Sequence, residues 1–163
     1  MLPTIDWQGD TIVMVDQRKL PGQEIYVRCR NAQEVARAIR TMVIRGAPAI
    51  GVAAAMGLAL GMRKSSAKGT KQFAVEFQKS CDMMAGTRPT AVNLFWAIDR
   101  MKTAFAAGAQ AGESPEEIAD RLEREAPEAR GRAPAVDLEI DAEAVGLVDE
   151  RDARGPVPRA AAG

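Results

Sequence analysis

The sequence has 163 residues, its 22 Lys and Arg balance 22 Asp and Glu, and it contains no histidine. Its length allows one domain with a core of its own, and its zero net charge excludes a general attraction to nucleic acids or to anionic membrane surfaces. The absence of histidine removes the commonest zinc ligand and the side chain best suited to proton transfer near neutral pH. We expect no metal site, and we expect no cofactor.

The first 30 residues predict a small antiparallel β-sheet. Two short apolar segments, Ile5–Trp7 and Thr11–Val15, are separated by Gln8-Gly9-Asp10, a sequence typical of a tight hairpin turn. After the break at Leu20-Pro21-Gly22, β-branched and aromatic residues alternate with charged ones over Glu24–Cys29. This alternation predicts a third, half-exposed strand.

Two helices are expected next. Asn31 predicts an N-cap, and Glu34 three residues later completes a reciprocal capping box. The apolar stripe that follows carries this helix to about Val43, and its members are Val35, Ala38, Ile39 and Met42. Residues 49–61 are small or apolar on nearly every face of a helix, a pattern typical of a buried helix.

Three more segments have helical periodicity. Residues 71–84 predict a surface helix with apolar positions at Phe73, Val75, Phe77, Cys81 and Met84. Residues 90–107 predict a longer helix with one broad apolar face, formed by Val92, Leu94, Phe95, Ala97, Ile98, Met101 and Phe105. Ser114-Pro115-Glu116-Glu117 predicts a capped helix start, with the helix continuing to about Arg124. The expected fold is therefore α+β, a small antiparallel β-sheet followed by a helical bundle.

The composition changes after Ala126. Residues 127–163 are dense in Ala, Arg, Glu, Asp, Gly and Pro and have no aromatic residue. Such a composition cannot bury much apolar surface, so we expect a poorly structured tail. Within it, only Val136–Ile140 has strand-like alternation.

The two cysteines and the distribution of apolar residues indicate where in the cell the protein is located. Cys29 and Cys81 fit no metal-binding pattern, the N-terminus does not look like a signal peptide, and no apolar run approaches the roughly 20 residues needed to cross a bilayer. We therefore expect a soluble, cytoplasmic protein with no membrane partner.

Two arginine-bearing turns are candidates for ligand binding. In Arg45-Gly46-Ala47-Pro48, glycine allows close approach of the backbone, proline presets a first helical turn, and arginine offers planar donors suited to phosphate. In Thr87-Arg88-Pro89-Thr90, Arg88 stands at the head of the next helix. For both, the alternative is an ordinary helix boundary with a solvated arginine.

Three segments resemble those of the methylthioribose-1-phosphate isomerase family: Asp16–Pro21, Ile44–Ala55 and Thr87–Met101. They occur in the order expected for that family, and the resemblance runs from about Leu2 to Ala126. The wider family includes regulatory subunits of translation initiation factor 2B and ribose-1,5-bisphosphate isomerases, which share the Arg-Gly-Ala turn in looser form. The full run from Arg88 to Met101 favours the methylthioribose enzymes.

The resemblance implies an aldose–ketose isomerisation without a cofactor, in which 5-methylthioribose 1-phosphate becomes 5-methylthioribulose 1-phosphate in methionine salvage. It implies that Arg45, Gly46, Ala47 and Arg88 contact this phosphosugar, and that the protein forms a homodimer. The family's catalytic cysteine and aspartate lie later in the chain, in a Rossmann-like C-terminal domain that has no counterpart in this sequence.

No residue of this chain is therefore assigned a catalytic role. Cys29 and Cys81 lack the sequence neighbours of the family's cysteine, and Cys81 is expected in the core. Asp16 and Asp99 are expected to be solvated or capping groups. We expect the chain to be inactive on its own.

Residues 1–126 are thus expected to form the N-terminal domain of the family, and residues 127–163 a tail outside it. The abrupt loss of resemblance after Ala126 suggests a frameshift followed by premature termination, a hypothesis that resequencing the coding DNA tests. Two alternatives to an isomerase domain remain. One is a non-catalytic module that binds a phosphosugar or nucleotide or mediates assembly, like the initiation-factor subunits, and the other is an inert fragment with exposed apolar surface.

Overall fold

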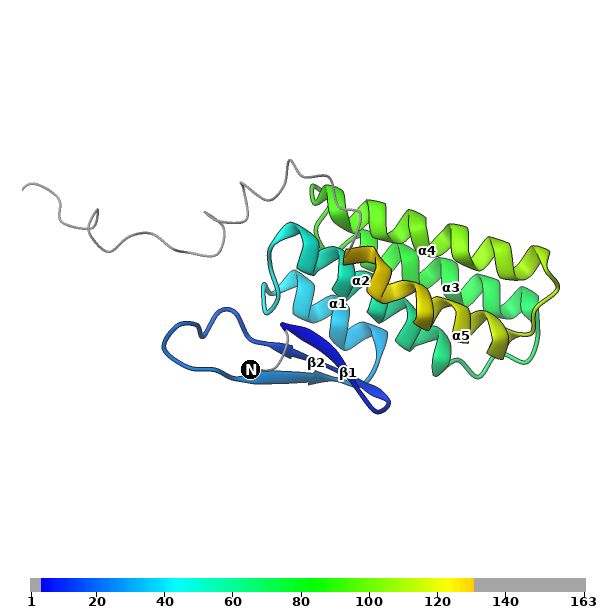
Figure 1. Cartoon of the computed structure of the whole chain (residues 1–163). Helices are drawn as coiled ribbons and strands as arrows, with labels where there is room; N and C mark the ends of the chain where they lie inside the picture. Colours follow the sequence, from blue (N-terminus) through cyan, green and yellow to red (C-terminus); the bar gives the residue numbers. More distant parts are fainter. Residues whose placement is uncertain (1–3, 131–163) are drawn as a thin grey trace, which may run out of the picture.

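The computed structural model describes residues 4–130, which fold into a three-stranded antiparallel sheet and a helical bundle (Figure 1). The strands are β1 (Ile5–Gln8), β2 (Thr11–Val15) and β3 (Tyr26–Cys29), with β2 in the centre. Ile5 pairs with Met14 in the first hairpin, and Ile12 pairs with Cys29 across the second. The predicted α+β class and the hairpin are confirmed, and β3 begins two residues later than expected.

Five α-helices and a short 3-10 helix follow the sheet. They are α1 (Ala32–Arg40), α2 (Ala47–Arg63), α3 (Thr70–Ala85), α4 (Val92–Gln110), α5 (Pro115–Glu125) and η1 (Ala126–Arg130). Successive α-helices alternate in direction, so the α1–α2 and α3–α4 connections lie at the same end of the bundle (Figure 1). None of the helices in the described part of the chain is long and apolar enough to span a membrane.

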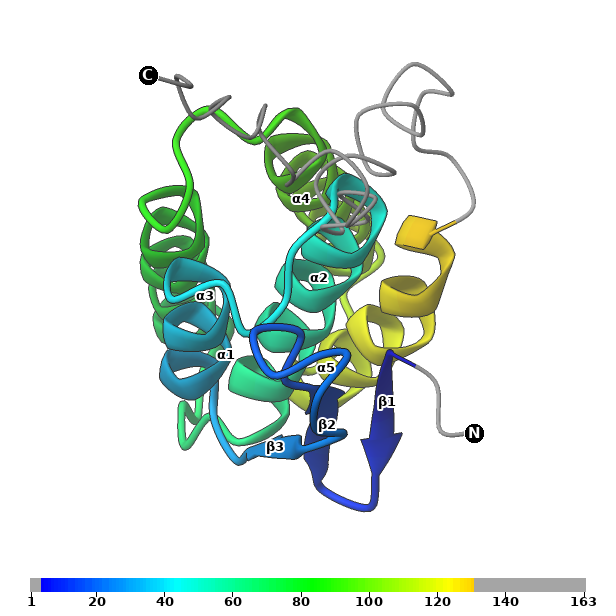
Figure 2. The same cartoon turned by 90° about the vertical axis from the view of Figure 1, so that its left-hand side faces the viewer.

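Helix α2 is the centre of the molecule. It contacts α1, α3, α4, α5 and η1, and it lies between them in Figure 2. Because it has neighbours on all sides, it has no polar face, and Ala54, Leu58 and Leu60 are completely buried. Burial of each leucine contributes about 1.5–3 kcal/mol relative to an exposed position. The predicted buried helix is confirmed.

Helix α1 differs from its predicted form at both ends. The Asn31 side chain accepts a hydrogen bond from the Glu34 N–H (2.8 Å), but the Glu34 carboxylate accepts from the N–H of Arg30 rather than that of Asn31 (2.6 Å), so the reciprocal box does not form. The helix ends at Arg40 because Met42 adopts a left-handed conformation (φ 61°), and the Val43 N–H then donates back to the Ala38 carbonyl. Met42, predicted in the apolar stripe, is exposed.

The predicted apolar faces of α3 and α4 also need correction. Phe73, Phe77, Cys81 and Met84 are buried, but Val75 is exposed because it lies on the opposite face of α3. In α4, which begins at Val92 rather than Thr90, Val92 and Phe95 are exposed. The buried face of α4 is therefore narrower than the sequence suggested.

The packed chain continues past Ala126. Residues 127–130 belong to η1, in which Ala129 is buried and packs with α2 and α5. The capping box predicted at Ser114 is present, and α5 ends one residue beyond the expected Arg124. The rest of the expected tail, including the alternation at residues 136–140, lies outside the described residues.

Candidate functional site

The Arg45-Gly46-Ala47-Pro48 turn forms the start of α2. Gly46 is the N-cap residue and has φ 90° and ψ 134°, a conformation that residues with a Cβ rarely adopt. Pro48 lies in the first helical turn, where a backbone N–H has no partner within the helix, so its missing N–H costs no hydrogen bond. Residues 45–49 are half-buried. The turn thus brings the amide end of a helix to an accessible surface.

This turn is anchored by Gln17, a residue that sequence reasoning did not select. The Gln17 side-chain oxygen accepts a hydrogen bond from the Arg45 backbone N–H (2.7 Å). The Gln17 backbone carbonyl oxygen accepts one from the Arg45 guanidinium (3.2 Å). The Gln17 N–H donates to the Val43 carbonyl at 2.9 Å. Gln17 could have been suggested by its position in Asp16–Pro21, one of the segments that resemble the family.

Asp16 holds the neighbouring segment in place. Its carboxylate accepts from the Arg18 Nε and Nη2 at 2.8 and 2.7 Å and from the Arg18 backbone N–H at 3.1 Å. These hydrogen bonds hold the pKa of Asp16 below its usual value. Asp16 is buried rather than solvated, whereas Asp99 is exposed as expected. Asp16 therefore has a structural role beside the Arg45 turn.

The second turn, at Arg88, lies between α3 and α4. The buried Thr87 hydroxyl donates to the Met84 carbonyl at 2.6 Å, and the Ala91 N–H donates to the Arg88 carbonyl at 3.0 Å. Arg88 is half-buried, and its guanidinium has no hydrogen-bond or ion-pair partner among residues 4–130. The N-cap residue of α4 is Ala91, which makes no side-chain cap hydrogen bond. Within the described part of the chain, the turn therefore presents an unpaired cation beside a helix start without a side-chain cap.

The two turns lie at the same end of the molecule, which faces the viewer in Figure 2. Helices α2 and α4 are in direct contact there, because a Cβ placed on Gly51 would lie only 3.1 Å from the Asn93 carbonyl oxygen. Gly51 is four residues after Ala47, and Asn93 is five after Arg88. Arg45, Gly46 and Ala47 therefore lie at the start of one of two helices that are in contact, and Arg88 precedes the start of the other.

The electrostatics of this end favour an anion. Each helix start carries roughly half a positive charge from its aligned peptide dipoles, and both α2 and α4 begin here. Arg45 and Arg88 add two formal positive charges. A phosphate group would meet the positive ends of both helices and the guanidinium donors together.

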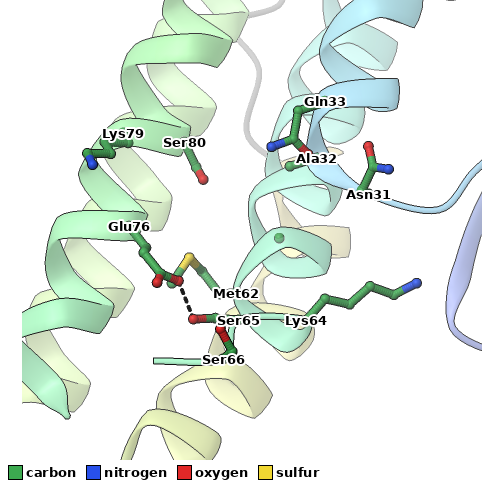
Figure 3. A pocket seen from close by; sticks show the side chains of 11 residues that line it. Asn31, Ala32, Gln33, Met62, Lys64, Ser65, Ser66, Glu76, Lys79 and Ser80 are labelled. Carbon is green, nitrogen blue, oxygen red and sulfur yellow. Dashed lines mark hydrogen bonds between the residues drawn. The ribbon is translucent and has the colours of Figure 1, made fainter. Parts of the chain in front are cut away.

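A separate hollow of about 400 Å³ lies near the other end of α2 (Figure 3). It is lined by the start of α1, the end of α2 and one face of α3, and the Ser65 hydroxyl within it donates to the Glu76 carboxylate. Lys64 points away from it and pairs with Asp10 at 3.5 Å. Gly61, on its wall, is about 21 Å along the helix from Ala47, so this hollow is distinct from the two turns.

Neither cysteine is available for chemistry in the folded protein. Both side chains are buried, and burial raises the pKa of Cys29 to about 11 and that of Cys81 to about 12. The predicted core position of Cys81 is confirmed. Within residues 4–130, no three Cys, Asp or Glu side chains gather closely enough to hold a metal ion.

Comparisons with known proteins agree on one family. The model of the initiation factor 2 subunit family matches residues 43–153. A methylthioribose-1-phosphate isomerase of Geobacter metallireducens is 46% identical over 147 residues, and one of Geobacter sulfurreducens is 60% identical over 99 residues. These alignments cover 90% and 61% of this chain but 42% and 29% of the relatives, so the chain spans less than half their length.

Two solved structures share the fold. The 5-methylthioribose 1-phosphate isomerase from Pyrococcus horikoshii OT3 has a TM-score of 0.75 and 37% identity. The delta subunit of translation initiation factor eIF-2B from A. fulgidus has a TM-score of 0.72 and 38% identity. Each comparison covers 79% of this chain and 36% of the other. The family resemblance read from the motifs is confirmed, and the family match continues beyond residue 126.

Proposed function

The chain belongs to the initiation factor 2 subunit family, and we propose that its two arginine turns form the sugar-phosphate-binding part of an aldose–ketose isomerase. The relatives named methylthioribose-1-phosphate isomerase suggest the substrate, 5-methylthioribose 1-phosphate, and the product, 5-methylthioribulose 1-phosphate. The observation that carries the proposal is the convergence of the Arg45 and Arg88 turns at the adjoining starts of α2 and α4.

Each turn has a role suited to its surroundings. The Gln17 bonds fix the Arg45 turn, so the N–H groups at the start of α2 are held in place before a ligand arrives. Arg88 has no partner among the described residues, so its guanidinium is available for a phosphate. A fixed turn and an available guanidinium together suit capture and orientation of a sugar phosphate.

The proton-transfer steps need other groups. Ring opening and hydrogen transfer between adjacent carbons require an acid or base positioned against the sugar. Histidine is absent, and both thiols are buried with raised pKa values. We therefore expect this chain to bind the substrate but to show negligible turnover by itself.

Replacing Arg88 tests the binding role. In calorimetric titrations with methylthioribose 1-phosphate, Arg88→Ala should weaken binding by about 10- to 100-fold, the usual range for losing a charge-assisted hydrogen bond. Arg30→Ala is the matched control, because Arg30 is exposed and lies at the far end of α1. Equal affinities of wild type and Arg88→Ala would contradict the proposal, and robust turnover by the chain would contradict the account of the proton-transfer groups.

A second candidate function is a non-catalytic module that binds a phosphosugar or nucleotide as a regulatory signal. It is favoured by the eIF-2B delta subunit, whose structural similarity nearly equals that of the isomerase. Titration with nucleoside monophosphates discriminates the two. Preference for a nucleotide over methylthioribose 1-phosphate would favour the regulatory module.

Homodimer formation and the domain boundary at residue 126 stay predictions. The molar mass measured by light scattering during size-exclusion chromatography tests the first, and also separates a folded module from an aggregating fragment.

A further inference from the structure

Asn93 has a buried side chain that makes no hydrogen bond with the described residues. The residue is 2% exposed, and neither its side-chain nitrogen nor its side-chain oxygen has a partner among residues 4–130. Polar side chains that are buried this deeply are usually bonded, because leaving water without a replacement partner is unfavourable. An amide that keeps both atoms unpaired therefore needs an explanation.

The position of Asn93 connects it to the two arginine turns. It is the second residue of α4, and its Cβ lies 3.6 Å from where a Cβ on Gly51 would be. Gly51 lies one helical turn into α2, about 6 Å along the axis from Ala47. The unpaired amide therefore lies where the two helix starts meet.

The first turn of α4, like those of α2 and α3, has no side-chain cap at its N-cap residue. Its N-cap residue, Ala91, offers no side-chain hydrogen bond, whereas α1 and α5 both have capped starts. Such a turn can shift slightly at little cost. A ligand reaches the Asn93 amide only after such a shift, because the residue is 2% exposed in the closed bundle.

The chemistry of the amide differs from that of the arginines. It is neutral, it donates two hydrogen bonds, and it accepts two, which matches the hydroxyl groups of a sugar better than a phosphate dianion. A buried group of this kind discriminates strongly, since a ligand without the matching hydroxyl leaves it unpaired.

We propose that Asn93 is a specificity-determining residue of the candidate site, whose amide bonds to the hydroxyl-bearing part of the sugar phosphate while Arg45 and Arg88 bind the phosphate. This assignment rests on the proposed function of the two turns. It gives the site two separable parts, one that recognises charge and one that recognises the sugar.

The test is Asn93→Leu, which keeps the side-chain size and removes the polar atoms. Binding of the full chain to two probes, methylthioribose 1-phosphate and inorganic phosphate, is measured together with the unfolding temperature. Affinity for the sugar phosphate should fall by about tenfold, affinity for inorganic phosphate should stay within about twofold, and the unfolding temperature should stay the same or rise. Arg88→Ala should instead weaken binding of both probes.

Three outcomes would overturn the proposal. Unchanged affinity of Asn93→Leu for the sugar phosphate would show that the amide does not recognise the sugar. An equal loss for both probes with a lower unfolding temperature would show a purely structural role. If the wild type binds neither probe, the proposed function fails as well. Should Asn93→Leu not fold, Asn93→Ala, which adds no volume, is judged by the same criteria.

Discussion

Gly46 shows how one residue sets the geometry of a candidate site. Its φ of 90° and ψ of 134° place the N–H groups at the start of α2 outward, and a Cβ makes this conformation unfavourable by about 1–3 kcal/mol. The sequence alone suggested a glycine needed for close backbone approach. The structure adds the stronger requirement of a positive φ.

Gly46→Ala should therefore lower the free energy of unfolding by about 1–3 kcal/mol, measured by urea denaturation followed by circular dichroism. Gly86→Ala is a matched control at the end of α3, where φ is −75° and an added Cβ would make only ordinary contacts. That variant should be neutral or more stable by up to about 1 kcal/mol, because alanine has fewer unfolded conformations. Equal effects of the two variants would contradict the strain argument.

Gln17 and Asn93 mark the limit of prediction at the residue scale. Arg45 and Arg88 could be selected because arginine beside a helix start has a direct chemical meaning. Gln17 contacts Arg45, which is 28 positions away in the sequence. Asn93 is notable only because its buried side-chain atoms make no hydrogen bond with the described residues. Neither property is encoded in local spacing.

At the scale of elements, α5 illustrates a local signal that is sufficient. The Ser114 hydroxyl accepts from the Glu117 N–H at 3.2 Å, and the Glu117 carboxylate accepts from the Ser114 N–H at 2.7 Å. All participating groups lie within four residues, so the sequence contains the whole interaction. At α1 the same spacing gave only half of the box, because the Glu34 carboxylate bonds to Arg30 instead.

Ser114→Ala should consequently lower the free energy of unfolding by about 1 kcal/mol, a typical cost for losing an N-cap side chain, measured by chemical denaturation. Thr103→Ala provides the comparison. Its hydroxyl bonds to the Asp99 carbonyl of its own helix, and alanine favours helix more than threonine does. If Thr103→Ala lowers the free energy of unfolding as much as Ser114→Ala does, the capping box makes no specific contribution to stability.

The apolar faces of the helices were predicted less well than their boundaries. Val75, Val92 and Phe95 fit helical spacing but are exposed, since periodicity identifies a broad stripe and the neighbouring helices cover only part of it. Val92 and Phe95 lie in the first turns of α4, at the end that carries Arg88. Their exposure is a property of the assembled bundle.

At the scale of the whole molecule, the core controls the chemistry of both thiols. Burial raises the pKa of Cys29 from 9.0 to about 11 and that of Cys81 from 9.0 to about 12. Above pH 9 the unfolded chain loses these protons while the folded chain keeps them. The folded state then binds more protons than the unfolded state, so stability falls as pH rises.

We therefore expect the free energy of unfolding to be insensitive to these two groups below pH 9 and to decline between pH 9 and 11. Urea denaturation across this range measures the decline, which should be smaller in a Cys29→Ala, Cys81→Ala double variant than in the wild type. At neutral pH the thiols should react with an aromatic disulfide reagent only as fast as the chain opens. Rapid labelling of the native protein would contradict the burial of both side chains.

The family, the α+β class, the hairpin, the buried helix after Pro48 and the capped start at Ser114 could all be predicted from the sequence, because short-range hydrogen bonding, periodicity and local motifs encode them. Only the packed structure shows that Gln17 anchors Arg45 and that the starts of α2 and α4 meet at Gly51 and Asn93. These features depend on contacts between segments far apart in the chain. Such contacts are set by how the helices pack around α2, which no local pattern specifies.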